Sequence, residues 1–171
     1  MEKNLSALGF MSGTSGDGVD TSVISSNGKD TINIKYNRFD PYPTNLSNKI
    51  HRVKESISEM RDLLKYSSEI DKLEIEITDF HIDIAIKATK EVDYDLIGFH
   101  GHTIYHNAEE KISKQIGIGA KLSKLTNKDV VCNFRQNDIN NGGDEICFLD
   151  ISASLENRET MVNVVKKTAN E

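Results

Sequence analysis

The sequence predicts an α/β fold built on one mixed sheet, and three observations lead to that prediction. Three strand-like segments joined by short turns open the chain. Longer segments with helical spacing follow them. Short apolar segments with strand character then alternate with a second helical segment. This order fits a sheet that begins antiparallel and becomes parallel after the first helices.

The first three strands are predicted from apolar segments and turn signals. Residues 5–11 and 19–25 are short and apolar, as buried strands are. Asn27-Gly28 is a strong hairpin signal, and residues 31–39 after it alternate apolar and polar side chains. Two prolines within residues 40–43 remove backbone donors and end the sheet. We therefore expect a three-stranded amino-terminal meander.

Two helices are predicted next. Thr44 is expected to be the N-cap of the first, whose apolar residues recur at helical spacing: Leu46, Ile50, Val53 and Ile57. Residues 69–92 alternate locally like strands but also carry an unbroken helical stripe. No Gly, Pro or Asn interrupts them, and they are too long for one strand and lack a turn for two. We predict a helix with a wide buried face.

The second half of the chain has shorter elements. We expect a strand at 96–99 continuing through a bend at Gly101 to 106, a strand and turn at 114–119, a helix at 120–125 and a strand at 130–134. The character changes after Gly142-Gly143. Residues 154–171 are polar with a thin helical stripe, which predicts a frayed helix or disordered end.

Composition narrows the class of protein. The length of 171 residues suits one domain, and the net charge of −6 disfavours nucleic acid and anionic membranes as partners. Cys132 and Cys147 suggest reduced thiols. No segment approaches the length of a membrane span, and the first residues do not form a signal peptide. We expect a soluble, cytoplasmic protein.

A glycine-rich loop between the first two strands is the first candidate site. Its backbone can turn tightly, approach a ligand closely and offer successive N–H groups to an anion. Its carboxylates are suited to hold a cation at a phosphate or to accept a proton from a sugar hydroxyl. The alternative is a solvated turn. The residues concerned are Ser12, Gly13, Thr14, Ser15, Gly16, Asp17, Gly18, Val19 and Asp20.

Histidines form a second candidate site. His100, His102 and His106 share strand parity, so on a continuous strand all three rings would face one way and suit a metal ion. Gly101 is expected to break that regularity. The favoured interpretation is that the histidines hydrogen-bond a ligand or the backbone, with no metal.

Two polar segments follow. Residues 115–119 place a glycine pair before a helix start, where a ligand can meet the helix N-terminus. Residues 133–138 come directly after a buried strand, where α/β sheets bind ligands. Arg135 can pair with a carboxylate or phosphate there, and Asp138 can act as a base. The alternative is an ordinary surface loop.

Four motifs in this order resemble the anhydro-N-acetylmuramic acid kinases of bacterial cell-wall recycling. The resemblance covers about residues 5–143. The motifs are Met11-Ser12-Gly13-Thr14-Ser15-x-Asp17-Gly18-Val19-Asp20, then Ile97-Gly98-Phe99-His100-Gly101-x-Thr103-Ile104-Tyr105-His106, then Gln115-Ile116-Gly117-x-Gly119, and last Val130-Val131-x-x-Phe134-Arg135-x-x-Asp138 with Gly142-Gly143.

The resemblance implies an actin-like, sugar-kinase ATPase (ribonuclease H-like) lobe over residues 1–143 and a divergent tail at 144–171. It also implies ATP and Mg²⁺ as cofactors. The family cleaves the 1,6-anhydro bond of its sugar with water while ATP phosphorylates the 6-oxygen. By the same resemblance, residues 13–20 bind ATP phosphates, and the sugar-binding residues are His100, Gly101, His102 and Thr103. The catalytic positions would be Asn133, Arg135 and Asp138.

Departures from the family pattern limit the expected activity. Asn133 stands at the position of the family's general-base Asp, and an amide cannot accept a proton at neutral pH. The family usually has Gln at His102, Asp at Ile118 and a bulky apolar residue at Gly16. From this resemblance we expect the given sequence to lack the family's second lobe. We therefore expect either an anhydro-sugar kinase or an inactive, binding-only form of one. A homo-oligomer or a separately encoded second lobe are the expected protein partners.

Overall fold

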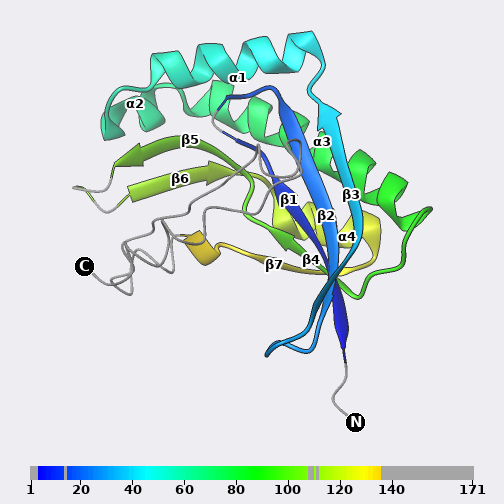
Figure 1. Ribbon diagram of the computed structural model, residues 1–171. Helices are drawn as coiled ribbons and strands as arrows, with labels where there is room; N and C mark the ends of the chain where they lie inside the picture. The colour runs from blue at the N-terminus through cyan, green and yellow to red at the C-terminus, as the bar shows by residue number, and fades with distance from the viewer. Residues whose placement is uncertain (1–3, 14, 108–109, 111, 136–171) are drawn as a thin grey trace.

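A five-stranded mixed sheet runs through the part of the chain that the structure describes. The computed structural model describes residues 4–13, 15–107, 110 and 112–135 (Figure 1). The first three strands pair antiparallel, and β4 and β7 join β1 in parallel, which confirms the predicted mixed sheet with an amino-terminal meander. The strand order is β3-β2-β1-β4-β7, formed by β1 (Leu5–Met11), β2 (Gly18–Ser26), β3 (Ile32–Pro41), β4 (Leu96–Phe99) and β7 (Asp129–Cys132).

The turn between β2 and β3 confirms the hairpin signal. Gly28 has a φ of +75°, a backbone conformation that glycine adopts without strain. The Asn27 side-chain oxygen accepts hydrogen bonds from the N–H groups of Lys29, Asp30 and Thr31, at 3.0, 3.2 and 3.1 Å. These bonds fix the turn and thereby the register of the two strands.

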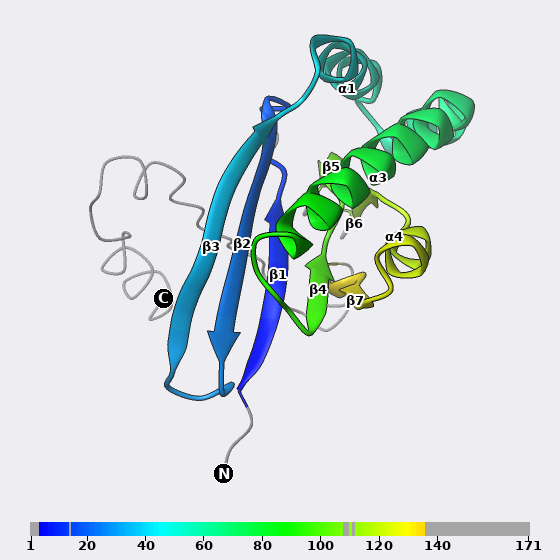
Figure 2. The ribbon, with the colours of Figure 1, turned by 90° about the vertical axis from the view of Figure 1, so that its right-hand side faces the viewer.

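Helices lie on one side of the sheet (Figure 2). They are α1 (Thr44–Ser56), the short α2 (Met60–Lys65), the long α3 (Ser67–Thr89) and α4 (Gly119–Thr126). The helix predicted over 69–92 is confirmed as α3. Five residues of its predicted stripe are buried and the sixth, Phe80, is half-buried; the buried ones are Ile70, Leu73, Ile77, Ile84 and Ala88. Burial of that stripe against the sheet outweighs the local strand-like alternation.

The N-cap prediction for Thr44 is wrong. Pro43 is the N-cap of α1, and Thr44 is already the first helical residue. The Pro43 carbonyl accepts the N–H groups of Leu46 and Ser47, at 2.9 and 3.0 Å, and no side chain caps the helix. Proline is well placed here because its fixed φ suits the turn into a helix and its missing N–H is not needed.

Two strand boundaries and one short helix differ from the sequence prediction. β7 ends at Cys132, not 134, because Asn133 takes a left-handed backbone conformation, with φ at +63°. β6 (Ile112–Ile116) begins two residues earlier than expected and pairs with β5 (His102–Asn107) in a separate hairpin. The short α2 was not foreseen. The predictions for Asp138 and for the tail at 144–171 concern residues outside the described ranges.

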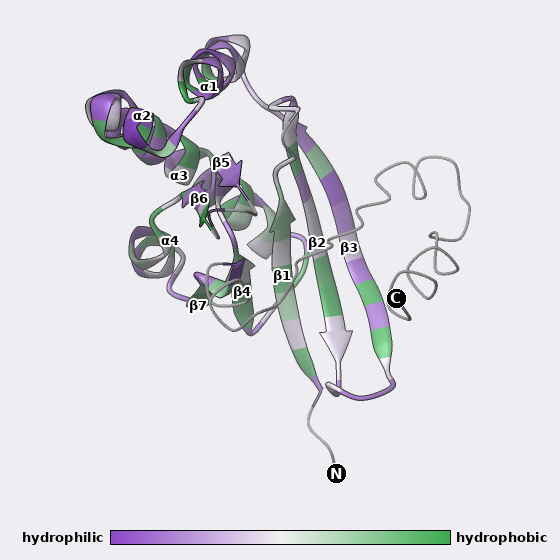
Figure 3. Cartoon of the chain, turned by 90° about the vertical axis from the view of Figure 1, so that its left-hand side faces the viewer, coloured by the Kyte–Doolittle hydropathy of each residue, from purple (hydrophilic) through white to green (hydrophobic). Residues whose placement is uncertain are grey.

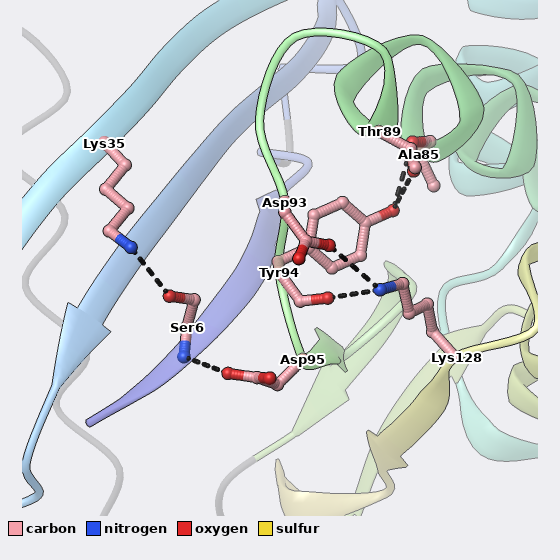
Figure 4. Close-up of polar contacts among 8 residues, drawn as sticks. All are labelled: Ser6, Lys35, Ala85, Thr89, Asp93, Tyr94, Asp95 and Lys128. Atoms are coloured by element: carbon pink, nitrogen blue, oxygen red, sulfur yellow. Dashed lines mark hydrogen bonds and ion pairs between the residues drawn. The ribbon is translucent and has the colours of Figure 1, made fainter. Parts of the chain in front are cut away.

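Hydrogen bonds connect the residues just before β4 to β1, β3, α3 and the loop before β7 (Figure 4). Asp95 accepts the Ser6 N–H at 2.7 Å, and Lys35 donates to the Ser6 hydroxyl at 3.1 Å, which links β4 to β1 and β3. The buried Tyr94 hydroxyl donates to the Ala85 carbonyl of α3 at 3.1 Å, and Lys128 donates to the Tyr94 carbonyl. These contacts stabilise the end of the sheet where β4 begins. The candidate site lies at the opposite end.

The core lies between the sheet and the helices. Alternate residues of β1, β2 and β4 face the helices and are buried, including Leu8, Phe10, Val23, Ile97 and Phe99. The opposite face of the sheet carries exposed apolar side chains. Apolar residues along β1, β2 and β3 are coloured green in Figure 3. Among the helices of the described residues, none is long and apolar enough to cross a membrane.

Candidate functional site

The glycine loop between β1 and β2 is tied to the loop that follows β4. Ser12 is buried, and its hydroxyl donates a 2.9 Å hydrogen bond to the Gly101 carbonyl. The Ser47 hydroxyl of α1 donates to the Gly16 carbonyl at 2.8 Å, and Gly16 has a φ of +68°. The first two predicted motifs therefore meet at the carboxyl ends of β1 and β4, where α/β sheets bind ligands.

The remaining loop residues differ in what they can offer a ligand. The Ser15 hydroxyl donates to Asp17 at 2.6 Å, and the pKa of Asp20 is raised by partial burial and by the charge of Asp17. Two carboxylates thus lie close enough to influence each other, an arrangement that favours a bound cation. Val19 is fully buried in the core, so its side chain faces away from any ligand. Gly13 and Gly18 flank these groups, and Thr14 lies outside the described residues.

Gly101 lets two loops approach each other. Its φ is +74°, and a Cβ at this position would lie 2.4 Å from the Ile116 carbonyl oxygen. Only glycine accommodates both conditions. The close contact places the end of β6 against the loop after β4, which positions His100 and the β5–β6 hairpin relative to each other.

Replacing Gly101 with Ala is therefore expected to destabilise the protein by about 2 kcal/mol or more, because a left-handed alanine and a backbone clash are introduced together. The midpoint of urea unfolding measures this loss. Gly28→Ala is a matched control: Gly28 also has a positive φ, but nothing lies within 4 Å of a Cβ there. Equal losses in the two variants would show that the contact with Ile116 has no energetic role.

One pocket brings together residues from three predicted motifs. It has a volume of about 230 Å³ and lies between the loop after β4, strand β6 and the residues after β7. Its lining combines hydrogen-bonding groups, two rings and two cations: His100, Ser113, Lys114, Gln115, Asn133, Phe134 and Arg135. His100, Asn133 and Arg135 are sequence-predicted site residues, and the fold places all three in this one pocket.

Three histidines, His81, His100 and His102, lie close enough to influence one another's charge. Burial lowers the pKa of His81 to about 4, and burial together with the Arg135 charge lowers that of His100 to about 4. Burial, with Lys54 nearby, lowers the pKa of His102 to about 3. All three rings are neutral at pH 7. A neutral imidazole has one donor and one acceptor nitrogen, and both ring nitrogens of His100 are buried.

His102 and Thr103 do not line the pocket with His100. His102 is fully buried, and its ring lies edge-on to the Tyr42 ring with centroids 6.1 Å apart. Thr103 is half-buried, and its hydroxyl accepts a hydrogen bond from Gln115 at 3.3 Å. Of the second motif, His100 alone therefore lines the pocket.

The geometry does not support the alternative of a three-histidine metal site. A register shift between Thr103 and Tyr105 interrupts the alternation of β5, so His102 is buried while His106 is exposed. Within the described ranges, no three His, Cys, Asp or Glu side chains are grouped so as to hold a metal ion.

The predicted ligand position at the start of α4 is occupied by the protein itself. The Glu74 carboxylate accepts the Gly117 N–H at 2.9 Å, and the Thr78 hydroxyl accepts the Ile118 N–H at 3.0 Å. Both acceptors come from α3. Two amides that a ligand would need are thus already paired, and the segment positions β6 and α4.

Sequence reasoning missed three residues of the site region. Ser113 and Lys114 line the pocket because β6 pairs with β5, a relation that no local pattern reveals. His81 lies in α3, where its ring contacts Phe10 and Phe99 at centroid distances of 5.0 and 5.1 Å. A histidine facing the apolar side of a helix was the one signal that could have identified it.

Comparisons with known proteins identify the same family that the motifs resemble. Residues 5–163 match the family model described as anhydro-N-acetylmuramic acid kinase. A protein of that name from Pelagibacter ubique is 47% identical over 145 residues, which cover 84% of this chain and 39% of the relative. Relatives of the same name from Rhizobium johnstonii and Gluconobacter oxydans are 35% and 36% identical, over 80% and 81% of this chain and 38% of each relative. The chain thus spans about two fifths of the length of these curated relatives.

Proposed function

The chain belongs to the anhydro-N-acetylmuramic acid kinase family, and we propose that it forms the amino-terminal lobe of such an ATP-dependent kinase. In this proposal 1,6-anhydro-N-acetylmuramic acid binds in the pocket at His100, Asn133 and Arg135. The convergence of those three residues in one pocket carries the proposal. The strand order β3-β2-β1-β4-β7 supports an actin-like, sugar-kinase type of lobe over residues 1–143.

The family reaction transfers a phosphoryl group from ATP to the sugar 6-oxygen while water adds to the anhydro carbon. The bond between that carbon and the 6-oxygen breaks, and the product is N-acetylmuramate 6-phosphate. In this chain Arg135 would pair with negative charge on the ligand. Neutral His100 would hydrogen-bond a sugar hydroxyl, and Asn133 would orient the water without taking its proton.

The glycine loop fits the magnesium–phosphate end of ATP. Asp17 and Asp20 lie close enough that the charge of Asp17 raises the pKa of Asp20, so a divalent cation between them and a phosphate would relieve their repulsion. The Gly16 N–H is paired with the Gly13 carbonyl at 3.1 Å, so other backbone amides of the loop would hold the phosphates. When bound, ATP supplies the phosphoryl group for transfer.

A binding-only function is the second candidate, and Asn133 favours it. Asparagine cannot act as a general base at neutral pH, although it preserves the size and hydrogen-bonding reach of an aspartate. A protein that holds the anhydro-sugar without turnover is consistent with the same pocket. The two candidates differ in turnover and agree in sugar binding.

Calorimetric titration with 1,6-anhydro-N-acetylmuramic acid tests the proposed site. Arg135→Ala is expected to weaken binding by about 10–150-fold, because a charge-assisted hydrogen bond contributes about 1.5–3 kcal/mol. Arg61→Ala on α2, where the arginine is exposed and outside the pocket, is the control and should bind like the unaltered chain.

Absence of binding by the unaltered chain would overturn both candidates. Binding with sugar-dependent ADP release, after addition of the carboxyl-terminal part of the Pelagibacter ubique relative, would support the kinase. Binding without ADP release under the same conditions would support the binding-only function.

A further inference from the structure

The pocket between the loop after β4, strand β6 and the residues after β7 is lined by positive and neutral groups. Lys114 and Arg135 contribute its two cations. Among the described residues that line it, none is Asp or Glu. A small space whose lining supplies positive charge and no carboxylate attracts anions.

The fold brings the two cations to the same pocket from separate elements. Arg135 lies close enough to His100 for its charge to help lower the pKa of that ring, and the His100 and Phe134 rings pack with centroids 6.3 Å apart. Lys114 belongs to β6, where it pairs with Tyr105 of β5. A guanidinium binds an oxyanion through two parallel hydrogen bonds, and an ammonium adds a point charge. Together the two groups suit an oxyanion with two negative charges.

The neutral groups of the pocket suit a sugar. The Gln115 amide donates to the Ser113 hydroxyl at 2.6 Å and to the Thr103 hydroxyl at 3.3 Å, so these side chains are held on the β5–β6 hairpin. Asn133 adds a second amide to the lining. Amides and hydroxyls hydrogen-bond sugar hydroxyls and do not repel an anion. The volume of about 230 Å³ is below the range of about 300–1,000 Å³ that is usual for drug-sized ligands, which favours a single small molecule.

We propose that this pocket binds a sugar phosphate monoester, and binds it more tightly than the same sugar without the phosphate. A phosphate monoester carries a charge of about −1.5 to −2 at pH 7, which matches the two cations of the lining. The inference rests on the proposed function, since both place a sugar in this pocket. It adds that the chain retains the phosphorylated form, because position 133 carries an amide and no negative charge.

Calorimetric titration of the full chain compares N-acetylmuramate 6-phosphate with N-acetylmuramic acid, which differ only in the phosphate. The 6-phosphate is expected to bind at least about tenfold more tightly. Inorganic phosphate should bind at least about tenfold more weakly than the 6-phosphate, because it lacks the sugar. Divalent cations are left out, since without them Asp17 and Asp20 would repel a phosphate from the glycine loop.

Substitutions show whether the pocket is responsible for this preference. Lys114→Ala is expected to reduce the ratio of the two affinities about fivefold, whereas Lys124→Ala, which removes an exposed charge of α4 outside the pocket, should leave the ratio unchanged. Asn133→Asp should reduce the ratio about tenfold, because the new carboxylate would repel the phosphate. Asn133→Ala adds no charge and should keep the preference.

The outcomes separate this inference from the proposed function. If the anhydro-sugar binds but the 6-phosphate has no advantage over N-acetylmuramic acid or over inorganic phosphate, the inference is overturned and the proposed function stands. Binding of the 6-phosphate without any binding of the anhydro-sugar would support the inference and contradict the proposed substrate. A phosphate preference that requires Mg²⁺ and does not respond to Lys114→Ala would overturn the inference in favour of the glycine loop. Absence of binding by every one of these ligands would overturn both.

Discussion

Replacing Asn133 with Asp is expected to raise sugar-dependent ADP release by about 10²–10⁴-fold, when the chain is combined with the carboxyl-terminal part of a longer relative. The carboxylate would accept the proton of the attacking water, which the amide cannot. Asn133 already lines the pocket together with His100 and Arg135, so the new carboxylate would lie in the pocket. Its backbone φ of +63° is one that aspartate also tolerates, so the replacement should introduce no new strain.

Measuring the affinity for the sugar distinguishes a rise in turnover from a gain in binding. A base that acts on water should raise kcat and leave the calorimetric affinity for the sugar nearly unchanged. Asn133→Ala is the control, because it removes the amide without supplying a base, and its turnover should not rise. If Asn133→Asp and Asn133→Ala have equal turnover, the lost carboxylate is not the defect that limits this chain.

The free energy of unfolding is expected to fall steeply as the pH drops from about 6.5 to about 4. The pKa values of His81 and His100 are about 4 and that of His102 is about 3, against an ordinary 6.5 in the unfolded chain. Unfolding therefore takes up protons in this range. The stabilisation is complete above pH 6.5 and is lost on acidification, with each histidine contributing up to about 1.4 kcal/mol per pH unit.

Urea unfolding at several pH values measures this slope. His102→Gln should remove about a third of it, because one of the three depressed groups is gone. His106→Gln is the control, since His106 is exposed on β5 and its replacement should leave the slope unchanged. The charges that face these rings include Lys54 on α1 and Arg135 after β7. A pH-independent free energy between 4 and 6.5 would contradict the prediction.

Local sequence signals were sufficient to predict most of the secondary structure. Asn27-Gly28 determines one turn, and its side-chain hydrogen bonds act within four residues, so the sequence alone reveals it. The absence of breakers in α3 resolved the ambiguity between helix and strand. The end of β7 was misplaced because the left-handed conformation of Asn133 is not encoded in the apolar pattern of residues 130–134.

The individual residues of the site could be predicted from the sequence, but their arrangement in one pocket could not. Motifs identified His100, Asn133 and Arg135 separately, but their shared pocket depends on how β6 sits against β4 and β7. That placement results from the close contact of Gly101 with Ile116, which joins residues fifteen positions apart. Such contacts also bring Ser113 and Lys114 into the pocket, and no local sequence pattern marks these residues.

Helix α3 supports both sides of the site. Its Glu74 and Thr78 hold the amides of Gly117 and Ile118, and its His81 contacts Phe10 and Phe99 beneath the other two loops. Tolerance to mutation along α3 should therefore follow a period of about three to four residues, and the intolerant positions are far from any ligand. A genetic screen would identify this helix as essential, although none of its residues lines the pocket.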